Sequence, residues 1–596
     1  METSTVALPE TPVSIRPSVV PRDGRALNLA LFLVALFPAA LVIRLIAEYG
    51  VNVPFGDEWA MIPLFAKWHD HQMTLADLFR QHNEHRIFFP KLIYLAFAQL
   101  THWNLRGEMF FSVFLCGLTS ASLYGLLRRT VGGTTRRRLT LWAISNVLIF
   151  SPAQAENWLW GFQLQMFMPT VCLVAALLVL QTPALNIARF LGVTVLALIA
   201  TFSFGNGLLI WPVLGLALFL SGVNKRWIIA WAGLCVLTVA LYFTGYETHP
   251  LPGHPSFPAR YYVIYFLRFN GNALNLFPVP GQLTLAAAIG AGAVLLLGAM
   301  TLHFLREQRQ ALRAAAPWIA LAAYAVGSSL IAAHSRIHEG IAQALSSRYS
   351  SISINLYIAL LVLFAIAADF ARPRGARFHF SRIAGSCVSP FMAMLLVWSL
   401  ASFPAVYVRI RNLSELCTHG VAYLHFARVI QPSVNLRHHL HIHAEFPELM
   451  QNLAVLDRLE LITPPFCHSN LLTDSADQPD RQTGEFGRCD PAVRRSATTV
   501  ELSGRAFVPA LEEPAPCILL AYEAGGQWFS FAILEVGEKR PDAAADFGEA
   551  YQYSGWRTIV DTSELPKKAR QISAWSVDPT TGNVFKLPGT ILLPVS

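Results

Sequence analysis

The sequence predicts a mainly α-helical, polytopic membrane bundle followed by a smaller β-sandwich-like domain at the C-terminus. Apolar residues make up 54% of the 596 positions and charged residues only 14%, whereas soluble domains carry about 25% charged residues. The strongly apolar part ends near Pro404, and the remainder is much more polar. The chain therefore divides into a membrane part and a soluble part.

The basic residues indicate membrane topology rather than nucleic-acid binding. The net charge is +8, but arginine and lysine gather in short connectors between apolar runs, as the positive-inside rule predicts for cytoplasmic loops. Arg16, Arg22 and Arg25 precede the first run, 27–43. Because further runs follow and no clean small-residue cleavage site is evident, we expect an uncleaved first span after a cytoplasmic tail, 1–26.

We expect about eleven spans in a membrane domain of residues 27–404, since each span needs roughly 20 apolar residues. One further segment, Ile87–Leu100, is apolar enough to cross, but it would then place the arginine-rich connector 128–138 on the outer face, against the positive-inside rule. We therefore predict that it lies along the outer interface, with the N-terminus inside and the C-terminal domain outside. The expected spans are 27–47, 107–128, 138–153, 163–181, 187–203, 207–221, 227–246, 283–305, 316–334, 350–370 and 382–404.

This topology assigns the charged and aromatic connectors to the outer face. The first of them, 48–106, is rich in titratable side chains, and the others are 153–162, 247–282 and 335–349. Within 247–282, the segment Arg260–Asn275 carries tyrosines that suit the headgroup region.

Beyond residue 404 we expect a helical and loop linker, 405–495, and a β-sandwich-like domain, 496–596. A helix at Pro447–Leu461 would begin with proline in its first turn. Segments rich in β-branched and aromatic residues, separated by turn residues, predict the strands of the sandwich. They are Thr498–Phe507, Cys517–Tyr522, Trp528–Glu535, Trp556–Asp561, Gln571–Asp578 and Asn583–Leu593.

Four cysteines fall in this outer part, where disulfides are permitted: Cys417, Cys467, Cys489 and Cys517. Four cysteines allow three pairings. We favour a disulfide between Cys467 and Cys489 because they flank one polar loop, and free thiols throughout are the alternative.

The first outer loop holds the residues most suited to catalysis or metal binding. Asp57 and Glu58 could deprotonate an acceptor hydroxyl or amine or hold a metal ion, although Asp57 would also serve as a helix N-cap. His82 and His85 are three residues apart, so a helix would place them on one face, where a carboxylate could complete a metal site. Glu84 suits an acid, a base or an acceptor-binding residue, or a solvated loop charge.

The order of these features resembles the GT-C superfamily of membrane glycosyltransferases. The loop begins Gly56-Asp57-Glu58-Trp59, the interfacial segment opens with Phe89-Pro90-Lys91, and the next span ends in Arg128-Arg129. The resemblance is to the branch of protein O-mannosyltransferases and lipid A aminoarabinose transferases, in which an Asp-Glu pair starts the first outer loop and the Asp belongs to the catalytic centre. The resemblance implies an inverting transfer of a hexosyl or pentosyl group, with Asp57 as general base and Glu58 in support.

The resemblance also implies the partners. The donor would be a sugar on a polyprenyl phosphate or diphosphate, and the acceptor would be a glycan, a lipid or a protein on the outer side, at a bacterial inner membrane. Cationic groups should stabilise the leaving phosphate, and the candidates are Arg86, Lys91 and Arg348, the last with Tyr349 beside it. The sequence identifies no required cofactor, and a divalent metal is compatible with the site.

The second outer loop adds further candidates. Related enzymes often carry another acidic residue near this connection, and here it is Glu156. Trp158 and Trp160 would stack on a sugar or anchor the interface.

Two other classes of protein remain open. A transporter or flippase of a lipid-linked sugar should show interrupted spans with charges at the midplane, whereas most charges here lie at span ends. A non-catalytic cell-envelope assembly protein would tolerate the loss of Asp57. The absence of a Gly-x-x-x-x-Gly-Lys-Ser/Thr phosphate loop favours a lipid-linked donor over a nucleotide sugar.

Overall fold

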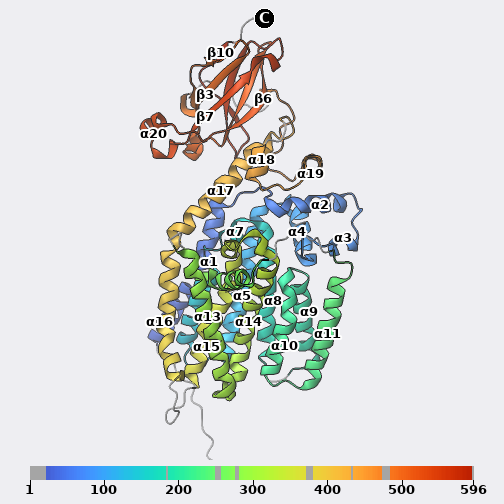
Figure 1. The fold of residues 1–596 in the computed structure, drawn as a ribbon, viewed down its shortest axis with the longest axis vertical. Coiled ribbons are helices and arrows are strands. Elements are labelled where there is room, and N and C mark those ends of the chain that lie inside the picture. Colours follow the sequence, from blue (N-terminus) through green and yellow to red (C-terminus); the bar gives the residue numbers. More distant parts are fainter. Residues whose placement is uncertain are drawn as a thin grey trace, which may run out of the picture.

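The computed structural model describes residues 22–182, 185–247, 257–274, 281–370, 380–430, 434–472 and 484–592. A bundle of apolar helices carries short helices and loops at one end, and a linker connects that end to a β domain (Figure 1). Most of the predicted tail 1–26, parts of the predicted loop 247–282 and the basic residues 371–379 lie outside the described residues.

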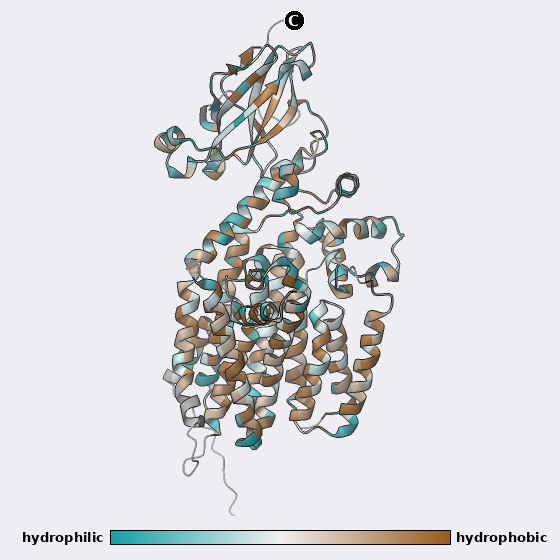
Figure 2. Ribbon diagram, in the orientation of Figure 1, coloured by the Kyte–Doolittle hydropathy of each residue, from teal (hydrophilic) through white to brown (hydrophobic). Residues whose placement is uncertain are grey.

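Seven helical segments in the described part of the chain are long and apolar enough to cross a membrane, or up to eight with one bent pair. The bent pair, α16 (Phe380–Ala401) and α17 (Phe403–His425), turns by 43° between its helices. The seven segments centre on α1 (Arg22–Tyr49), α5 (Leu105–Thr130), α8 (Leu164–Leu180), α11 (Lys225–Phe243), α13 (Gln282–Arg306), α14 (Leu312–Arg336) and α15 (Ser350–Asp369). The hydropathy of the ribbon agrees, since apolar residues predominate along these helices (Figure 2).

The expected count of about eleven spans is not confirmed, because three of the expected spans are short helices. They have 15, 15 and 11 residues, less than the roughly 20 residues that a full crossing needs. These helices are α6 (Thr135–Ile149), α9 (Ile187–Thr201) and α10 (Ile210–Leu220). The segment expected at the interface forms α4 (Phe88–Thr101), which is likewise short, with 14 residues.

The basic connectors lie together at one end of the bundle, which we call the basic end. Arg137 pairs with Asp369 at the C-terminus of α15. Arg313 donates to the carbonyl oxygen of Thr182 at 3.0 Å, and Asn186 and Arg226 line one shallow pocket. This grouping is the one that the positive-inside argument predicts for a single face.

The opposite end, which we call the site end, carries the short elements between the long helices. They are η1 (Gly56–Met61), α2 (Ile62–His69), α3 (Leu75–Phe79), α7 (Ala155–Leu159), η2 (Gly161–Gln163), η3 (Gly205–Leu209), α12 (Ala259–Gly271), η4 (Asn272–Leu274), η6 (Ile337–Glu339), η7 (Gln343–Leu345) and η8 (Ser347–Tyr349). One further short element, η5 (Arg309–Ala311), lies at the basic end instead. Three-residue and six-residue 3₁₀ turns suit this role because they reverse or bend the chain within few residues.

The linker packs on the site end. It consists of α17, α18 (Val434–His439) and α19 (Phe446–Arg458). The amide N–H of Gly56 donates to the carbonyl oxygen of Leu440 at 2.9 Å, and Arg458 of α19 contacts both carboxylate oxygens of Asp70 at 3.1 Å. The first loop of the membrane part and the linker therefore form one layer.

Two antiparallel five-stranded sheets form the β domain. In the first, β3 pairs with β1, β2, β4 and β7, and in the second, β5 lies between β6 and β8, which also pairs with β9 and β10. Leu502, Ile518, Trp556 and Ile572, drawn from both sheets, share one core, as a sandwich requires. The elements are η10 (Gly484–Phe486), β1 (Gly487–Cys489), β2 (Val493–Arg494), β3 (Thr499–Val508), η11 (Pro509–Leu511), β4 (Glu513–Pro514), β5 (Cys517–Ala524), β6 (Gln527–Glu535), α20 (Pro541–Phe547), η12 (Glu549–Tyr551), β7 (Gly555–Asp561), η13 (Thr562–Glu564), β8 (Gln571–Val577), β9 (Val584–Lys586) and β10 (Ile591–Leu592).

The favoured disulfide between Cys467 and Cys489 is not formed in the structure. The Sγ of Cys467 donates to the carbonyl oxygen of Ser469 at 3.0 Å. The backbone N–H of Cys467 donates to the carbonyl oxygen of His425 in α17. Cys489 is held in β1, opposite Gly504. The linker and the first sheet thus fix the two thiols in separate surroundings.

Candidate functional site

A cavity of about 970 Å³ opens where the loops of the site end meet. Its polar wall carries charged and imidazole side chains, and its apolar wall comes from α8, α11, α12, α14, α15 and α17. The residues of the polar wall are Asp57, His82, Glu84, His85, Glu156, His334, Arg336, Arg348, Tyr349, His441 and His443. A ligand with a polar head and an apolar chain would find both of its parts matched here.

Asp57 stands at the cavity because the turn before it is tightly held. Gly56 has a φ of +56°, a conformation that glycine adopts without strain. A Cβ on Gly56 would lie 2.8 Å from the ring of Trp160, so the turn needs glycine for space as well. On the other side, the ring of Phe55 lies 4.7 Å from the ring of His441, centroid to centroid.

The surroundings of Asp57 keep its carboxylate ionised. Burial alone would raise its pKa, but His82, whose Nε2 is 3.8 Å from Oδ1, lowers it. Arg348 and His443 add smaller effects in the same direction, and the net pKa of Asp57 is below its usual value. About 38% of the side chain is exposed, so this charged oxygen is accessible to a ligand.

Glu58 points away from the cavity and ties two loops together. Its side chain is buried, with Oε2 accepting from the N–H of Phe55 at 2.8 Å and Oε1 accepting from the N–H of Phe162 at 2.9 Å. Burial raises the pKa of Glu58 well above the usual range. Glu58, rather than Asp57, therefore closes the first turn of η1, and its contribution to the site is one of position.

The stretch from His82 to Arg86 is a tight turn, contrary to the helix that would place its two histidines on one face. His82 and His85 exchange both backbone hydrogen bonds, at 2.7 and 2.9 Å. The His85 ring is buried against Phe204, and burial lowers its pKa to about 3. His82 faces Asp57 instead, so the two imidazoles have different surroundings.

Glu84 reaches the cavity through an ion pair that the sequence did not single out. Its Oε2 accepts from Arg336 Nη2 at 2.7 Å, and Arg336 Nη1 donates to Glu339 at 2.8 Å. Arg336 lies at the end of α14, the same span-end position that drew attention to Arg348. That position was the available signal for Arg336.

Glu156, Arg348 and Tyr349 come together where α7 meets η8. Ser346 Oγ donates to Glu156 Oε2 at 3.1 Å, and the Asn157 side chain donates to the carbonyl oxygen of Arg348 at 2.9 Å. The Arg348 guanidinium lies 5.5 Å from the centre of the Tyr349 ring. Its ion pair with Glu339 is long, at 3.9 Å, which leaves donors directed at the cavity.

Arg86 and Lys91 do not serve the cavity in this way, contrary to the expectation from sequence. The Arg86 guanidinium donates to the carbonyl oxygens of Phe79, Tyr242 and Thr244 at 2.6–2.7 Å. Lys91 Nζ donates to three carbonyl oxygens at the C-terminal end of α3, those of Asp77, Leu78 and Arg80. Both side chains are buried, and their donors satisfy carbonyl oxygens at the C-terminal ends of α3 and α11, which have no partner within their own helix.

The two tryptophans of the second loop have different roles. Trp158 is fully buried, stacks on Phe167 and donates from Nε1 to the carbonyl oxygen of Ser151 at 2.9 Å. It does not line the cavity, contrary to its expected contact with a sugar. Trp160 does line the cavity, with its ring edge-on to Phe55 and stacked on Phe162.

A second, more polar cavity of about 1350 Å³ adjoins the first. Asp57, Glu84, Arg336 and His443 line both. The second cavity extends towards α12 and the loop after α11, where Arg80 and other polar groups line it. The residues shared by the two cavities therefore stand at a junction that two ligands could approach from different sides.

His441 and His443 come from the linker, far from Asp57 in sequence, and they line the first cavity. The histidine-rich composition of this segment was a weak signal, but nothing in the sequence indicated that the linker folds back on the first loop. Within the described residues, His82 and His85 belong to no group of three potential metal ligands; one such group occurs elsewhere, in the linker and β domain.

The comparisons with known proteins show one distant similarity. No family model matches the chain, and no curated protein matches its sequence. Among solved structures, the crystal structure of the oligosaccharyltransferase of Archaeoglobus fulgidus, in complex with zinc and sulfate, is similar at a TM-score of 0.34 and 12% identity. The similarity covers 74% of this chain and 58% of that chain, so this chain spans less than two thirds of that enzyme's length. We place no functional argument on a similarity of this size.

Proposed function

We propose that this chain is an integral-membrane glycosyltransferase that transfers a sugar from a polyprenyl-phosphate-type lipid to an acceptor, with inversion at the sugar carbon. The observation that carries the proposal is the meeting of the Asp57 carboxylate and the Arg348 guanidinium in one cavity at the end of the apolar bundle. The apolar wall suits a lipid chain, and the adjoining second cavity suits a hydrophilic acceptor.

In the proposed reaction, the acceptor oxygen or nitrogen attacks the anomeric carbon of the sugar. The bond from that carbon to the phosphate oxygen breaks, and the electron pair leaves with the lipid phosphate. The acceptor proton passes to Asp57, which is ionised because its pKa is lowered. Arg348 stabilises the charge that develops on the phosphate.

Arg348 suits the phosphate better than Arg336 does. Arg336 is already engaged by two carboxylates at 2.7 and 2.8 Å, whereas the one ion pair that Arg348 makes with a described residue is 3.9 Å long. A phosphate can compete with the longer pair at lower cost, and a guanidinium can contact two of its oxygens at once. Arg336 then holds Glu84 at the junction of the two cavities.

The test is the near-isosteric variant Asp57→Asn in membranes supplied with polyprenyl-phosphate sugars, scored by release of polyprenyl phosphate and sugar transfer. We expect the rate to fall about 10²–10⁴-fold, the usual contribution of a general base. Asp70→Asn is the matched control, because Asp70 lies in the same loop but pairs with Arg458 and lines neither cavity. Full activity of Asp57→Asn, with normal membrane insertion, would overturn the assignment.

A transporter would give a different pattern in the same preparation. It would move the intact lipid-linked sugar across the bilayer without releasing polyprenyl phosphate. An assembly protein would do neither, and it would tolerate Asp57→Asn in cells. The two readouts therefore separate all three classes.

A further inference from the structure

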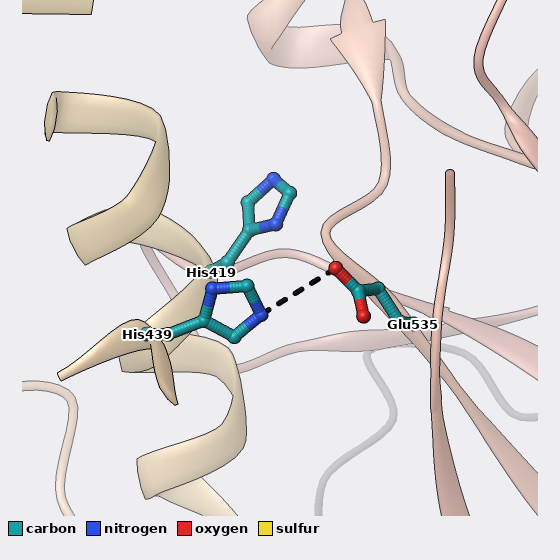
Figure 3. Close-up of side chains that lie close together, drawn as sticks. All are labelled: His419, His439 and Glu535. Carbon is teal, nitrogen blue, oxygen red and sulfur yellow. Dashed lines mark ion pairs between the residues drawn. The ribbon is translucent and has the colours of Figure 1, made fainter. Parts of the chain in front are cut away.

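Three side chains from three separate elements converge where the linker meets the β domain. His419 lies in α17, His439 is the last residue of α18, and Glu535 is the last residue of β6. One ligand atom from each lies within 4.8 Å of the other two, and His439 Nε2 is 3.6 Å from Glu535 Oε1 (Figure 3). This cluster lines neither cavity.

The local packing sets this convergence. Gly420 follows His419, and a Cβ on Gly420 would overlap the side chain of Leu440. The missing Cβ lets the end of α18 approach α17 closely, which leaves the His419 and His439 rings 5.3 Å apart, centroid to centroid. Glu535 is fixed from the other side by the pairing of β6 with β5, opposite Cys517.

The burial of the His439 ring without a hydrogen-bond partner needs an explanation. It is only 4% exposed, and both of its ring nitrogens lack a hydrogen-bond partner among the described residues. Buried polar groups in proteins are nearly always hydrogen-bonded. The 3.6 Å separation from Glu535 is too long for a hydrogen bond, but it suits two ligands of one ion.

We propose that His419, His439 and Glu535 bind a divalent transition metal, Zn²⁺ by preference. Two imidazole nitrogens and one carboxylate form a common three-ligand zinc set, with water in the fourth position. Ligands at about 2.1 Å from a tetrahedral ion lie about 3.4 Å from each other, so the His439–Glu535 spacing already fits. Small rotations of the half-buried His419 would complete the set.

The metal would fasten the β domain to the linker and, through the linker, to the cavity. Leu440 follows His439 directly, and its carbonyl oxygen accepts the N–H of Gly56, the residue before Asp57. Occupancy of the site would therefore restrain the turn that carries Asp57. The metal itself would not touch a substrate, and its binding is independent of the proposed sugar transfer.

The experiment measures zinc binding directly on the full-length chain in detergent micelles, purified with a histidine-free tag and stripped with a chelator. Zinc content after gel filtration and titration calorimetry give stoichiometry and affinity, and Co²⁺ substitution gives the absorption bands of a tetrahedral site. The variants are Glu535→Gln and His439→Ala. The Glu535 side chain is half exposed, so Glu535→Gln should fold normally and any loss of zinc binding should reflect the lost carboxylate. His438→Ala is the matched control, because His438 is the exposed neighbour on the same helix.

We expect about one Zn²⁺ per chain in the wild type and in His438→Ala. Glu535→Gln should bind at least about tenfold more weakly, and His439→Ala should lose the site. Zinc should raise the unfolding temperature of the wild type and the control most, that of Glu535→Gln less, and that of His439→Ala not at all. Undiminished binding in Glu535→Gln and His439→Ala, or no binding by the wild type at micromolar zinc, would overturn the proposal. Because none of these readouts is activity, failure here would leave the proposed function untouched.

Discussion

The substitution Gly56→Ala tests whether the turn before Asp57 is as closely determined as the geometry indicates. At a φ of +56°, an alanine costs about 1–2 kcal/mol relative to ordinary backbone. The added Cβ would also lie 2.8 Å from Trp160, whose ring is held between Phe55 and Phe162. Overpacking of this kind costs about 1–3 kcal/mol.

If the turn relieves this strain by tilting, the Asp57 carboxylate moves with it. A displacement of about 1 Å is enough to lower a catalytic rate about 100-fold. We therefore expect Gly56→Ala to lose both stability and sugar transfer. The assay combines thermal unfolding in micelles with the rate of sugar transfer in proteoliposomes.

Gly222→Ala is the matched control for backbone strain alone. Gly222 has a φ of +68°, and a Cβ there would meet nothing within 4 Å. It lies in the turn between α10 and α11, at the basic end, so the control should lose about 1–2 kcal/mol of stability and keep its rate. A wild-type transfer rate in Gly56→Ala would refute the reasoning, as would equal loss of stability in the two variants.

Three further predictions follow from the same contacts. Glu58→Gln leaves one buried backbone N–H facing an amide NH₂ and should lower the free energy of unfolding by about 1–3 kcal/mol. The control Glu48→Gln, at the exposed end of α1, should change the free energy of unfolding by less than about 0.5 kcal/mol, and equal effects would contradict the role of Glu58 in tying two loops together. Arg348→Gln should lower kcat/KM for the lipid donor at least about tenfold, because the guanidinium stabilises the charge that develops on the phosphate, with Arg348→Lys intermediate because an ammonium cannot form the two-pronged contact; an unchanged kcat/KM would exclude Arg348 from the phosphate site. The pKa of Asp57 is lowered, so its ionisation stabilises the fold above its unfolded-state pKa, and this stabilisation is lost as the pH falls through the folded-state pKa. Since His82 causes much of this lowering, the wild-type transfer rate should fall off at a lower pH than the rate of His82→Asn. If both rates fall off at the same pH, His82 does not act on Asp57.

The sequence predicted the strands of the β domain and several residues of the cavity wall. The six expected strands all form, since alternation and turn residues define a strand without reference to distant segments. The last of them divides into β9 and β10 around Pro588 and Gly589. Asp57, Glu84, Glu156, Arg348 and Tyr349 line one cavity, since the connectors that leave the same end of a bundle meet there.

The errors arose where tertiary contacts decide the role of a residue. Arg86 and Lys91 are residue types that bind phosphate, but the carbonyl oxygens at the ends of α3 and α11 accept hydrogen bonds from them instead. Trp158 and Trp160 are two residues apart and alike in type, yet one is core and the other cavity wall. The expected count of about eleven spans is not confirmed, because the expected spans 138–153, 187–203 and 207–221 form helices of 15, 15 and 11 residues, shorter than a full crossing needs.

The hydrogen bond from Gly56 to Leu440 has a consequence for biosynthesis. The first loop emerges early from the ribosome, but the segment that holds it and closes the cavity, through His441 and His443, is made only after the last apolar helix. A nascent chain that has inserted all its helices still has an incomplete cavity. Chains truncated before the linker would therefore insert without ever assembling the site.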